Sequence, residues 1–310
     1  MNTRCRNRRS RYEPHRRAIA RLRSDNRTMA MTIVPNGAGG YELKQRLLRP
    51  VVYLDHWAVR KFSENAGLQD RFIELLHKSR GTWLFSAANL SEFTVVTDLA
   101  QAEAVERLLL RAMPSLYVAD TVIDHGFFFA VNPEPHSNTP DQHWMLRDLG
   151  DRAVIIGGVW NTHRFVRDAI HHQAHLRPLF DSLKQGIAVA VATVAADPEN
   201  IAGARKFQPL PGMTLRGALL RELLREVVVR GAAEAFSDND AMDFIHAAST
   251  VPVCDFVLLD SAWCHRVNSS ARRMRKGGVT GVVAQCFSPK TISEFLIALD
   301  ACKHLGMEVV

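Results

Sequence analysis

The chain has 310 residues, 47% of them hydrophobic and 23% charged, which is the composition of an ordinary soluble globular protein of one or two domains. Its five cysteines, an odd number with no CxxC pair, suit a reducing cytoplasm and argue against a disulfide framework or a structural zinc site. The net charge of +7 is unevenly distributed: residues 1–28 hold ten Arg and two acidic residues, a charge of +8, and the other 29 basic and 30 acidic residues give −1.

Residues 1–28 form an Arg-rich tail with almost no apolar periodicity, so we predict that this tail is disordered. It is either an arm that adds salt-sensitive phosphate contacts or an over-extended start, since Met29 and Met31 could both initiate the chain. The tail lacks the apolar core of a secretory signal, and the longest apolar stretch, residues 186–196, is too short to span a bilayer. We therefore expect a cytoplasmic protein with no membrane partner.

The first part of the body predicts alternating strands and helices. Apolar and β-branched runs without alternation predict strands that are buried on both faces, as in a parallel sheet, at residues 51–55, 82–85 and 115–119. A helical pattern covers residues 57–79, and a second helix is expected to run to about residue 112 from a capping box between Asn89 and Glu92. This order is the start of a doubly wound α/β sheet.

The mostly helical pattern of residues 120–236 predicts a mainly helical insertion, which is interrupted by a Pro-rich loop and a Pro-Gly turn. The α/β pattern then resumes with a helix at 240–249, a buried strand at 253–259, a short helix and a strand at 281–284. A last helix is expected to open at Ser288-Pro289, because proline is tolerated in a first helical turn. The α/β domain is thus formed by residues 48–119 and 237–305.

Acidic residues lie where the predicted strands end. Asp55 and Asp260 each follow a buried strand, and Glu92 lies in the first turn of the helix after the second strand. These three are therefore expected at the carboxyl edge of the sheet, where open α/β sheets bind ligands. Asp243 opens the helix before the Asp260 strand, and topology alone does not locate it. Taken singly, a strand-terminal Asp is more often a helix cap than a metal ligand.

Clustered carboxylates repel one another unless a cation is present. Their hard oxygens suit Mg²⁺ or Mn²⁺, and such an ion can activate water and neutralise charge on a phosphodiester under attack.

Further candidates lie beside these acids. Asp240 is either an outer-shell ligand or, as we favour, a helix cap. His246, one helical turn after Asp243, either orients a carboxylate or contacts phosphate, or else is an ordinary hydrogen-bonded core histidine. A basic run begins twelve residues after Asp260 and either holds phosphate beside the metal or forms a solvated loop. It consists of Arg272, Arg273, Arg275 and Lys276.

Four short motifs, taken together and in order, resemble those of PIN-domain ribonucleases. They are VVYLD at residues 51–55, FSAANLSEF at 85–93, DFIHAA at 243–248 and FVLLD at 256–260. The resemblance covers about residues 50–119 and 237–305. It implies a three-layer α/β/α sandwich with a parallel sheet, in which Asp55, Glu92, Asp243 and Asp260 are catalytic and hold Mg²⁺ or Mn²⁺. Two departures are the 150 residues between Glu92 and Asp243 and a leucine in place of the threonine common in the fourth motif.

The resemblance implies an endoribonuclease that cleaves single-stranded RNA, in a toxin–antitoxin or RNA-processing role. A toxin would have an inhibitory protein partner. The alternative is a catalytically silent PIN-like module that binds RNA or a protein through the insertion. The intact set of four acids favours the nuclease.

Overall fold

The structure is a computed structural model that describes residues 29–35, 41–93, 98–119, 144–155, 158–231, 236–303 and 306–308. The Arg-rich tail at 1–28 and the predicted Pro-rich loop, residues 132–140, lie outside the described residues.

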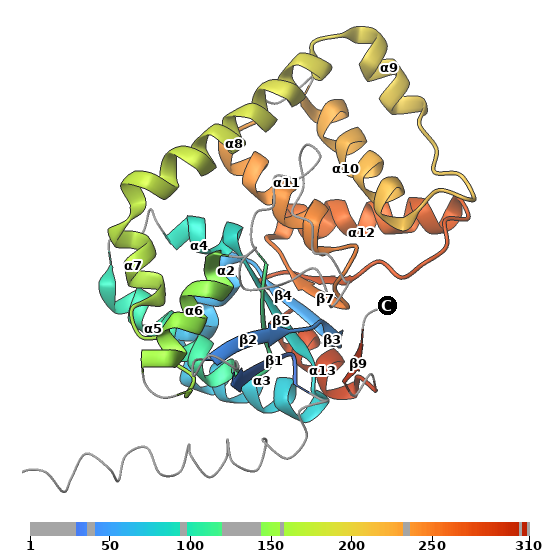
Figure 1. Cartoon of the computed structure of the whole chain (residues 1–310). Helices are drawn as coiled ribbons and strands as arrows, with labels where there is room; N and C mark the ends of the chain where they lie inside the picture. Colours follow the sequence, from blue (N-terminus) through green and yellow to red (C-terminus); the bar gives the residue numbers. More distant parts are fainter. Residues whose placement is uncertain are drawn as a thin grey trace, which may run out of the picture.

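A five-stranded parallel sheet lies at the centre of the described chain, which confirms the predicted α/β class (Figure 1). In spatial order the strands are β6 (Leu116–Ala119), β5 (Thr82–Ser86), β4 (Val51–Leu54), β7 (Phe256–Leu258) and β8 (Gln285–Phe287). The chain moves outward from β4 to β5 and β6, then returns to β7 on the other side of β4. Strand order therefore reverses between β4 and β7, and ligands of open α/β sheets bind at the carboxyl ends of such a pair.

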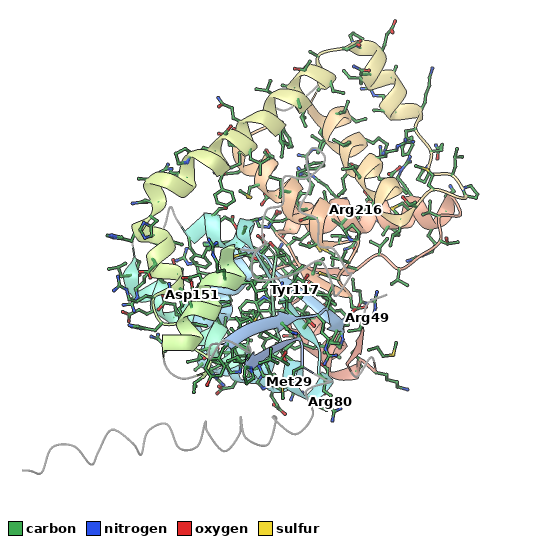
Figure 2. All side chains as sticks on the ribbon, in the orientation of Figure 1. Met29, Arg49, Arg80, Tyr117, Asp151 and Arg216 are labelled. Carbon is green, nitrogen blue, oxygen red and sulfur yellow. The ribbon has the colours of Figure 1, made fainter. Side chains whose placement is uncertain are left out.

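Side chains of the central strands alternate between two hydrophobic cores, one on each face of the sheet. Val52 and Leu54 belong to the first core, whereas Val51 and Tyr53 belong to the second. All four side chains are 0% exposed, so β4 is buried on both faces, as its unbroken apolar sequence predicted. Figure 2 shows side chains filling the space around the sheet, where Tyr117 of β6 is buried.

Helices from both ends of the chain cover the first face. They are α2 (His56–Glu64), α3 (Ala66–Ser79), α5 (Leu99–Ala112) and α13 (Ile292–Ala301). The second face is covered by α11 (Asp238–Thr250) and α12 (Ser261–Lys276). The short helix α4 (Ala87–Phe93) follows β5 directly and contributes side chains to both cores.

The described part of residues 120–236 is helical and shares both cores. It contains α6 (Trp144–Ile155), α7 (Phe165–His171), α8 (Gln173–Ala195), α9 (Pro198–Lys206) and α10 (Leu215–Gly231). Side chains of α6 and α7 pack in the first core, and those of α10 pack in the second. Figure 1 shows α8, α9 and α10 above the sheet in this view. No helix among the described residues is long and apolar enough to cross a membrane.

Several predicted boundaries are wrong. The helix predicted at 57–79 is two helices, because Asn65 ends α2 and caps α3. The helix expected to run from Asn89 to residue 112 is also two, since Asp98 caps a separate α5. The strand predicted at 281–284 lies four residues later, as β8. Pro289 lies in a turn before α13 and not in its first helical turn.

The predicted capping box is displaced by one helical turn. Ser86 and Asn89 form the reciprocal pair: the Asn89 N–H donates to Ser86 Oγ over 3.3 Å, and the Ser86 N–H donates to Asn89 Oδ1 over 3.0 Å. The Asn89 side-chain amide also donates to the Leu54 carbonyl over 2.9 Å. This bond ties the start of α4 to the end of β4, so Glu92 is not needed as a cap.

Two antiparallel strand pairs flank the sheet and were not predicted. They are β1 (Met31–Pro35) with β2 (Tyr41–Gln45), and β3 (Leu48–Arg49) with β9 (Met307–Glu308). Gln45 exchanges two side-chain hydrogen bonds with the backbone of Val118, which covers the free edge of β6.

Candidate metal centre

Two aspartates leave the paired ends of β4 and β7. The Asp55 N–H donates to the Leu258 carbonyl over 3.0 Å, which continues the β4–β7 pairing to this residue. The Asp55 carboxylate then caps α2 by accepting from the His56 N–H over 2.7 Å. Asp260 caps α12 in the same way, because its Oδ1 accepts from the backbone of Ala262 over 2.6 Å. Both acids are therefore helix caps that are held at the carboxyl edge of the sheet.

The cap leaves one oxygen of Asp260 without a partner. Its Oδ2 is buried and has no hydrogen bond among the described residues, although buried carboxylate oxygens are normally paired. An unsatisfied acceptor of this kind fits a position at which a cation supplies the missing partner. Acting as a cap and acting as a ligand are thus compatible roles for this residue.

His246 is the residue that joins the acids. Its Nε2 lies 3.1 Å from Glu92 Oε2 and 3.6 Å from Asp55 Oδ1, and its side chain is 0% exposed. On the other side of the ring, Nδ1 is hydrogen-bonded to the Tyr53 hydroxyl, which also contacts Ser86 Oγ. The hydrogen bond between Nδ1 and the Tyr53 hydroxyl fixes the ring orientation, as outer partners of metal-binding histidines commonly do.

Asp55, Glu92 and His246 form the candidate metal centre. Each offers one ligand atom, and these three atoms all lie within 4.8 Å of one another. Neighbouring ligands of an octahedral ion with bonds of 2.0–2.1 Å are about 3 Å apart, so the spacing fits coordination of a common divalent cation. An imidazole among the ligands favours a transition metal over Mg²⁺, because Mg²⁺ prefers oxygen.

Asp243 borders this centre without belonging to it. Burial, the Asp55 charge and smaller contributions from Asp260 and Glu92 raise its pKa to about 8, which shows that it shares their electrostatic surroundings. The three-residue set nevertheless contains neither Asp243 nor Asp260. Of the four predicted acids, the structure therefore brings Asp55 and Glu92 into ligand distance of each other and keeps the other two in the outer part of the cluster.

The centre is electrostatically frustrated without a cation. Burial, followed by the Glu92 charge, raises the pKa of Asp55 to about 7, although His246 opposes this shift. Burial alone would lower the pKa of His246, but the carboxylates of Glu92 and Asp55 outweigh it and raise the value to about 9. At neutral pH the His246 imidazolium therefore supplies positive charge where a metal ion would otherwise do so.

The remaining predicted residues divide into structural and exposed ones. Asp240 forms a capping box with Ser237 at the start of α11, which is the favoured interpretation of this residue. Arg273 donates to Glu222 over 2.8 Å and to the Phe207 carbonyl over 2.7 Å, so its guanidinium holds α12 against the α9–α10 segment. Arg272, Arg275 and Lys276 are exposed.

Sequence reasoning missed two residues near the centre. Tyr53 resembles an ordinary apolar strand residue, and only its hydroxyl in a fully buried strand could have marked it. Arg266 is 8% exposed, with its guanidinium carbon 4.5 Å from the Trp263 ring centroid and Nη1 3.8 Å from Asp240 Oδ1. A buried arginine beside an acidic cluster supplies positive charge from the α12 side.

The raised pKa values predict the pH dependence of stability in the absence of metal. For His246 (ordinary pKa 6.5, about 9 when folded), the added stability is complete below pH 6.5 and is lost as the pH rises through 9. The folded state also holds more protons than the unfolded state on Asp55 between pH 3.8 and about 7, and on Asp243 between pH 3.8 and about 8. All three pKa values are raised by folding, so each lowers the stability of the folded state as the pH rises. We therefore expect Tm in a chelator to fall as the pH rises from 6 to 9, measured by thermal unfolding. A constant or rising Tm over this range would contradict these assignments.

No protein-family model, no curated protein and no solved structure matches the chain. The motifs of the sequence and the geometry of the candidate metal centre are therefore the features that indicate a function.

Proposed function

We propose that the protein is a metal-dependent endoribonuclease whose divalent cation binds between Asp55, Glu92 and His246. The observation that carries this proposal is the convergence of three ligand atoms within 4.8 Å, from the residue after β4, from α4 and from α11, at the reversal point of the sheet. The order of the four acidic motifs supports phosphodiester hydrolysis of single-stranded RNA, as in the PIN-domain ribonucleases that they resemble. Mg²⁺ or Mn²⁺ is the expected ion, and the imidazole ligand favours Mn²⁺.

The residues have separate roles in this mechanism. Asp55 and Glu92 would hold the cation, and His246 would hold it through Nε2 while its Nδ1–H donates to Tyr53. When bound there, a divalent cation would supply an activated water and would offset charge on the phosphate. Asp243 would accept a proton from the attacking water at a carboxylate oxygen, once the positive charge of the cation had lowered its raised pKa and left the group ionised. Asp260 orients the edge of the centre through its cap of α12.

The second candidate is a catalytically silent module in which His246 serves as the permanent cation. The observation that favours it is the fully buried imidazolium between Glu92 and Asp55, which already offsets their charge. The two candidates differ in whether a divalent ion displaces the proton on His246. Metal binding that releases protons supports the nuclease, and absence of metal binding supports the silent module.

Replacing Asp55 with Asn tests the nuclease directly. Asn is as good a helix cap as Asp, so α2 keeps its first turn while the centre loses a charged ligand. We expect Asp55→Asn to lower metal-dependent cleavage of a fluorescent single-stranded RNA by more than about 100-fold. Its Tm without metal should hold or rise, because repulsion within the cluster is removed.

The matched control is Asp70→Asn on α3, where the side chain is 66% exposed and pairs with Arg111 at the surface. This variant should cleave like the wild type. Full activity of Asp55→Asn, or no metal-dependent cleavage by the wild-type protein, would overturn the proposed function.

Replacing His246 tests the choice of metal. With the imidazole in place, Mn²⁺ should bind more tightly than Mg²⁺, by a factor on the order of ten, in calorimetric titrations. His246→Gln should lose most of this preference, because an amide oxygen does not discriminate between the two ions as imidazole does. The exposed His172→Gln serves as the control and should keep the preference. Equal Mn²⁺-to-Mg²⁺ ratios in the wild-type protein and His246→Gln would exclude His246 as a ligand.

A further inference from the structure

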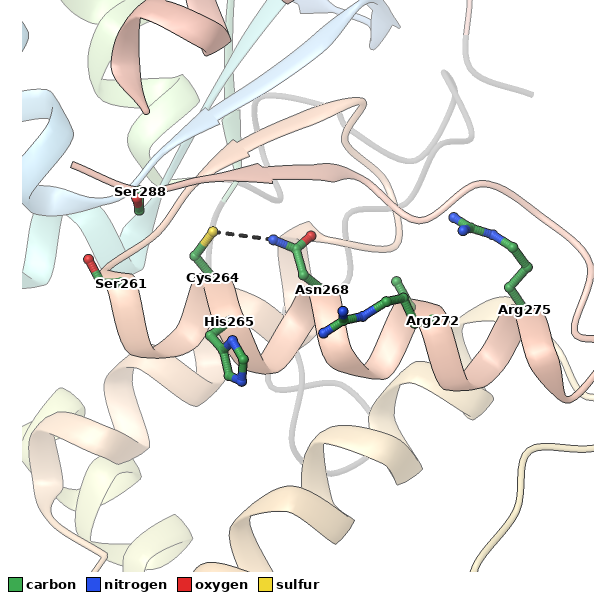
Figure 3. Close-up of a pocket in the computed structure, with 8 residues that line it drawn as sticks. Ser261, Cys264, His265, Asn268, Arg272, Arg275 and Ser288 are labelled. Atoms are coloured by element: carbon green, nitrogen blue, oxygen red, sulfur yellow. Dashed lines mark hydrogen bonds between the residues drawn. The ribbon is translucent and has the colours of Figure 1, made fainter. Parts of the chain in front are cut away.

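A pocket of about 550 Å³ runs along α12. We call it the α12 groove. Its lining includes Ser261, His265, Asn268, Arg272, Arg275 and Ser288. Figure 3 shows Ser261 and Ser288 at one end of the groove and Arg275 at the other.

One end of the α12 groove lies at the carboxyl edge of the sheet. Ser261 is the residue after Asp260, and Ser288 is the residue after the last residue of β8. Because β7 and β8 are parallel neighbours, both serines leave the sheet at the edge that also carries Asp55. The groove therefore begins where the proposed reaction takes place.

The other end of the α12 groove is basic. Lining residues recur every three or four positions along α12, which puts them on one face of the helix. Arg272 and Arg275 are exposed on this face, and among the described residues no acidic side chain forms an ion pair with either of them. Their neighbour Arg273 faces the other way and is paired with Glu222. Two arginines without acidic partners in a groove form a site for anionic groups such as phosphates.

The length of the groove suits an oligonucleotide. At about 1.5 Å per residue, Arg275 lies ~21 Å along the helix axis from Ser261. At 3.4 Å per nucleotide in a stacked strand, this distance corresponds to roughly six nucleotides, and to fewer in an extended strand. Between the two ends, the Asn268 amide can form hydrogen bonds with a base edge and the His265 ring can stack on a base.

We propose that the α12 groove binds the backbone of a single-stranded nucleic acid on one side of the bond to be cleaved. This inference rests on the proposed function, since it assigns the groove to the same substrate. The serine hydroxyls contact the phosphate nearest the centre, and Arg272 and Arg275 hold phosphates farther along the strand. The contacts of the arginines are electrostatic and therefore depend on salt.

The test measures binding without cleavage. Fluorescence anisotropy of a labelled unstructured twelve-nucleotide RNA is followed in a chelator between 50 and 200 mM salt, with the full chain. Each phosphate contact contributes about 0.7 to the salt slope of a single strand, so Arg272→Gln with Arg275→Gln should reduce the slope by about 1.4. The loss of affinity relative to the wild type should then be about sevenfold larger at 50 mM than at 200 mM salt.

A charge-matched double variant controls for net charge. Arg107→Gln with Lys303→Gln removes two exposed cations. Arg107 lies on α5 and Lys303 follows α13, and both helices cover the face of the sheet opposite to α12. It should bind RNA as the wild type does. Thermal unfolding of both double variants should match the wild type, because all four side chains are exposed.

Two results would overturn the groove assignment. One is an equal effect of the two double variants, and the other is an absence of RNA binding by the wild-type protein in the chelator. Either result leaves the metal centre to be judged separately, since Asp55→Asn and the metal titrations do not depend on the groove. A six-nucleotide RNA that binds as tightly as the twelve-nucleotide RNA would support the estimated length of the groove. A mononucleotide that binds as tightly as the twelve-nucleotide RNA would contradict a site for an extended strand.

Discussion

The repulsion between carboxylates at the carboxyl edge of the sheet is the constraint on which the rest of this structure depends. Asp55 and Glu92 are held close together, and burial penalises the charge of Asp55. The backbone holds them there, because pairing of β4 with β7 fixes Asp55 and the hydrogen bond from the Asn89 amide to the Leu54 carbonyl ties α4 to the end of β4. A positive charge between them relieves this repulsion, and either protonated His246 or a divalent ion can supply it.

The sheet was largely predictable because burial on both faces leaves a simple trace in sequence. Residues 51–54 carry no polar side chain except the Tyr53 hydroxyl, β6 has the same pattern, and the polar residues of β5 lie only at its two ends. β8 was misplaced because residues 281–284 are more apolar than Gln285–Phe287, whereas register is fixed by pairing of Leu258 with Phe287. The capping box was misassigned because two candidate pairs lie one turn apart, and the bond from Asn89 to Leu54 that distinguishes them joins residues distant in sequence.

The candidate site shows the same limit at the level of single side chains. Asp243 and His246 are one helical turn apart and share a face of α11, so spacing alone could not tell which one reaches Asp55 and Glu92. The contact that decides is the hydrogen bond between His246 and Tyr53, which belongs to a distant strand. In the basic run after Asp260, Arg273 differs from its exposed neighbours because it is paired with Glu222. Glu222 is distant in sequence, so the local sequence could not show this difference.

The position of a bound metal ion tests the central claim most directly. In crystals grown with Mn²⁺, the anomalous difference map should show a peak within about 2.5 Å of a carboxylate oxygen of Asp55, a carboxylate oxygen of Glu92 and Nε2 of His246. The same peak should be absent from Asp55→Asn crystals. An empty map for the wild-type protein, or a peak that lies between Asp243 and Asp260 and leaves His246 bonded to Glu92, would contradict the account.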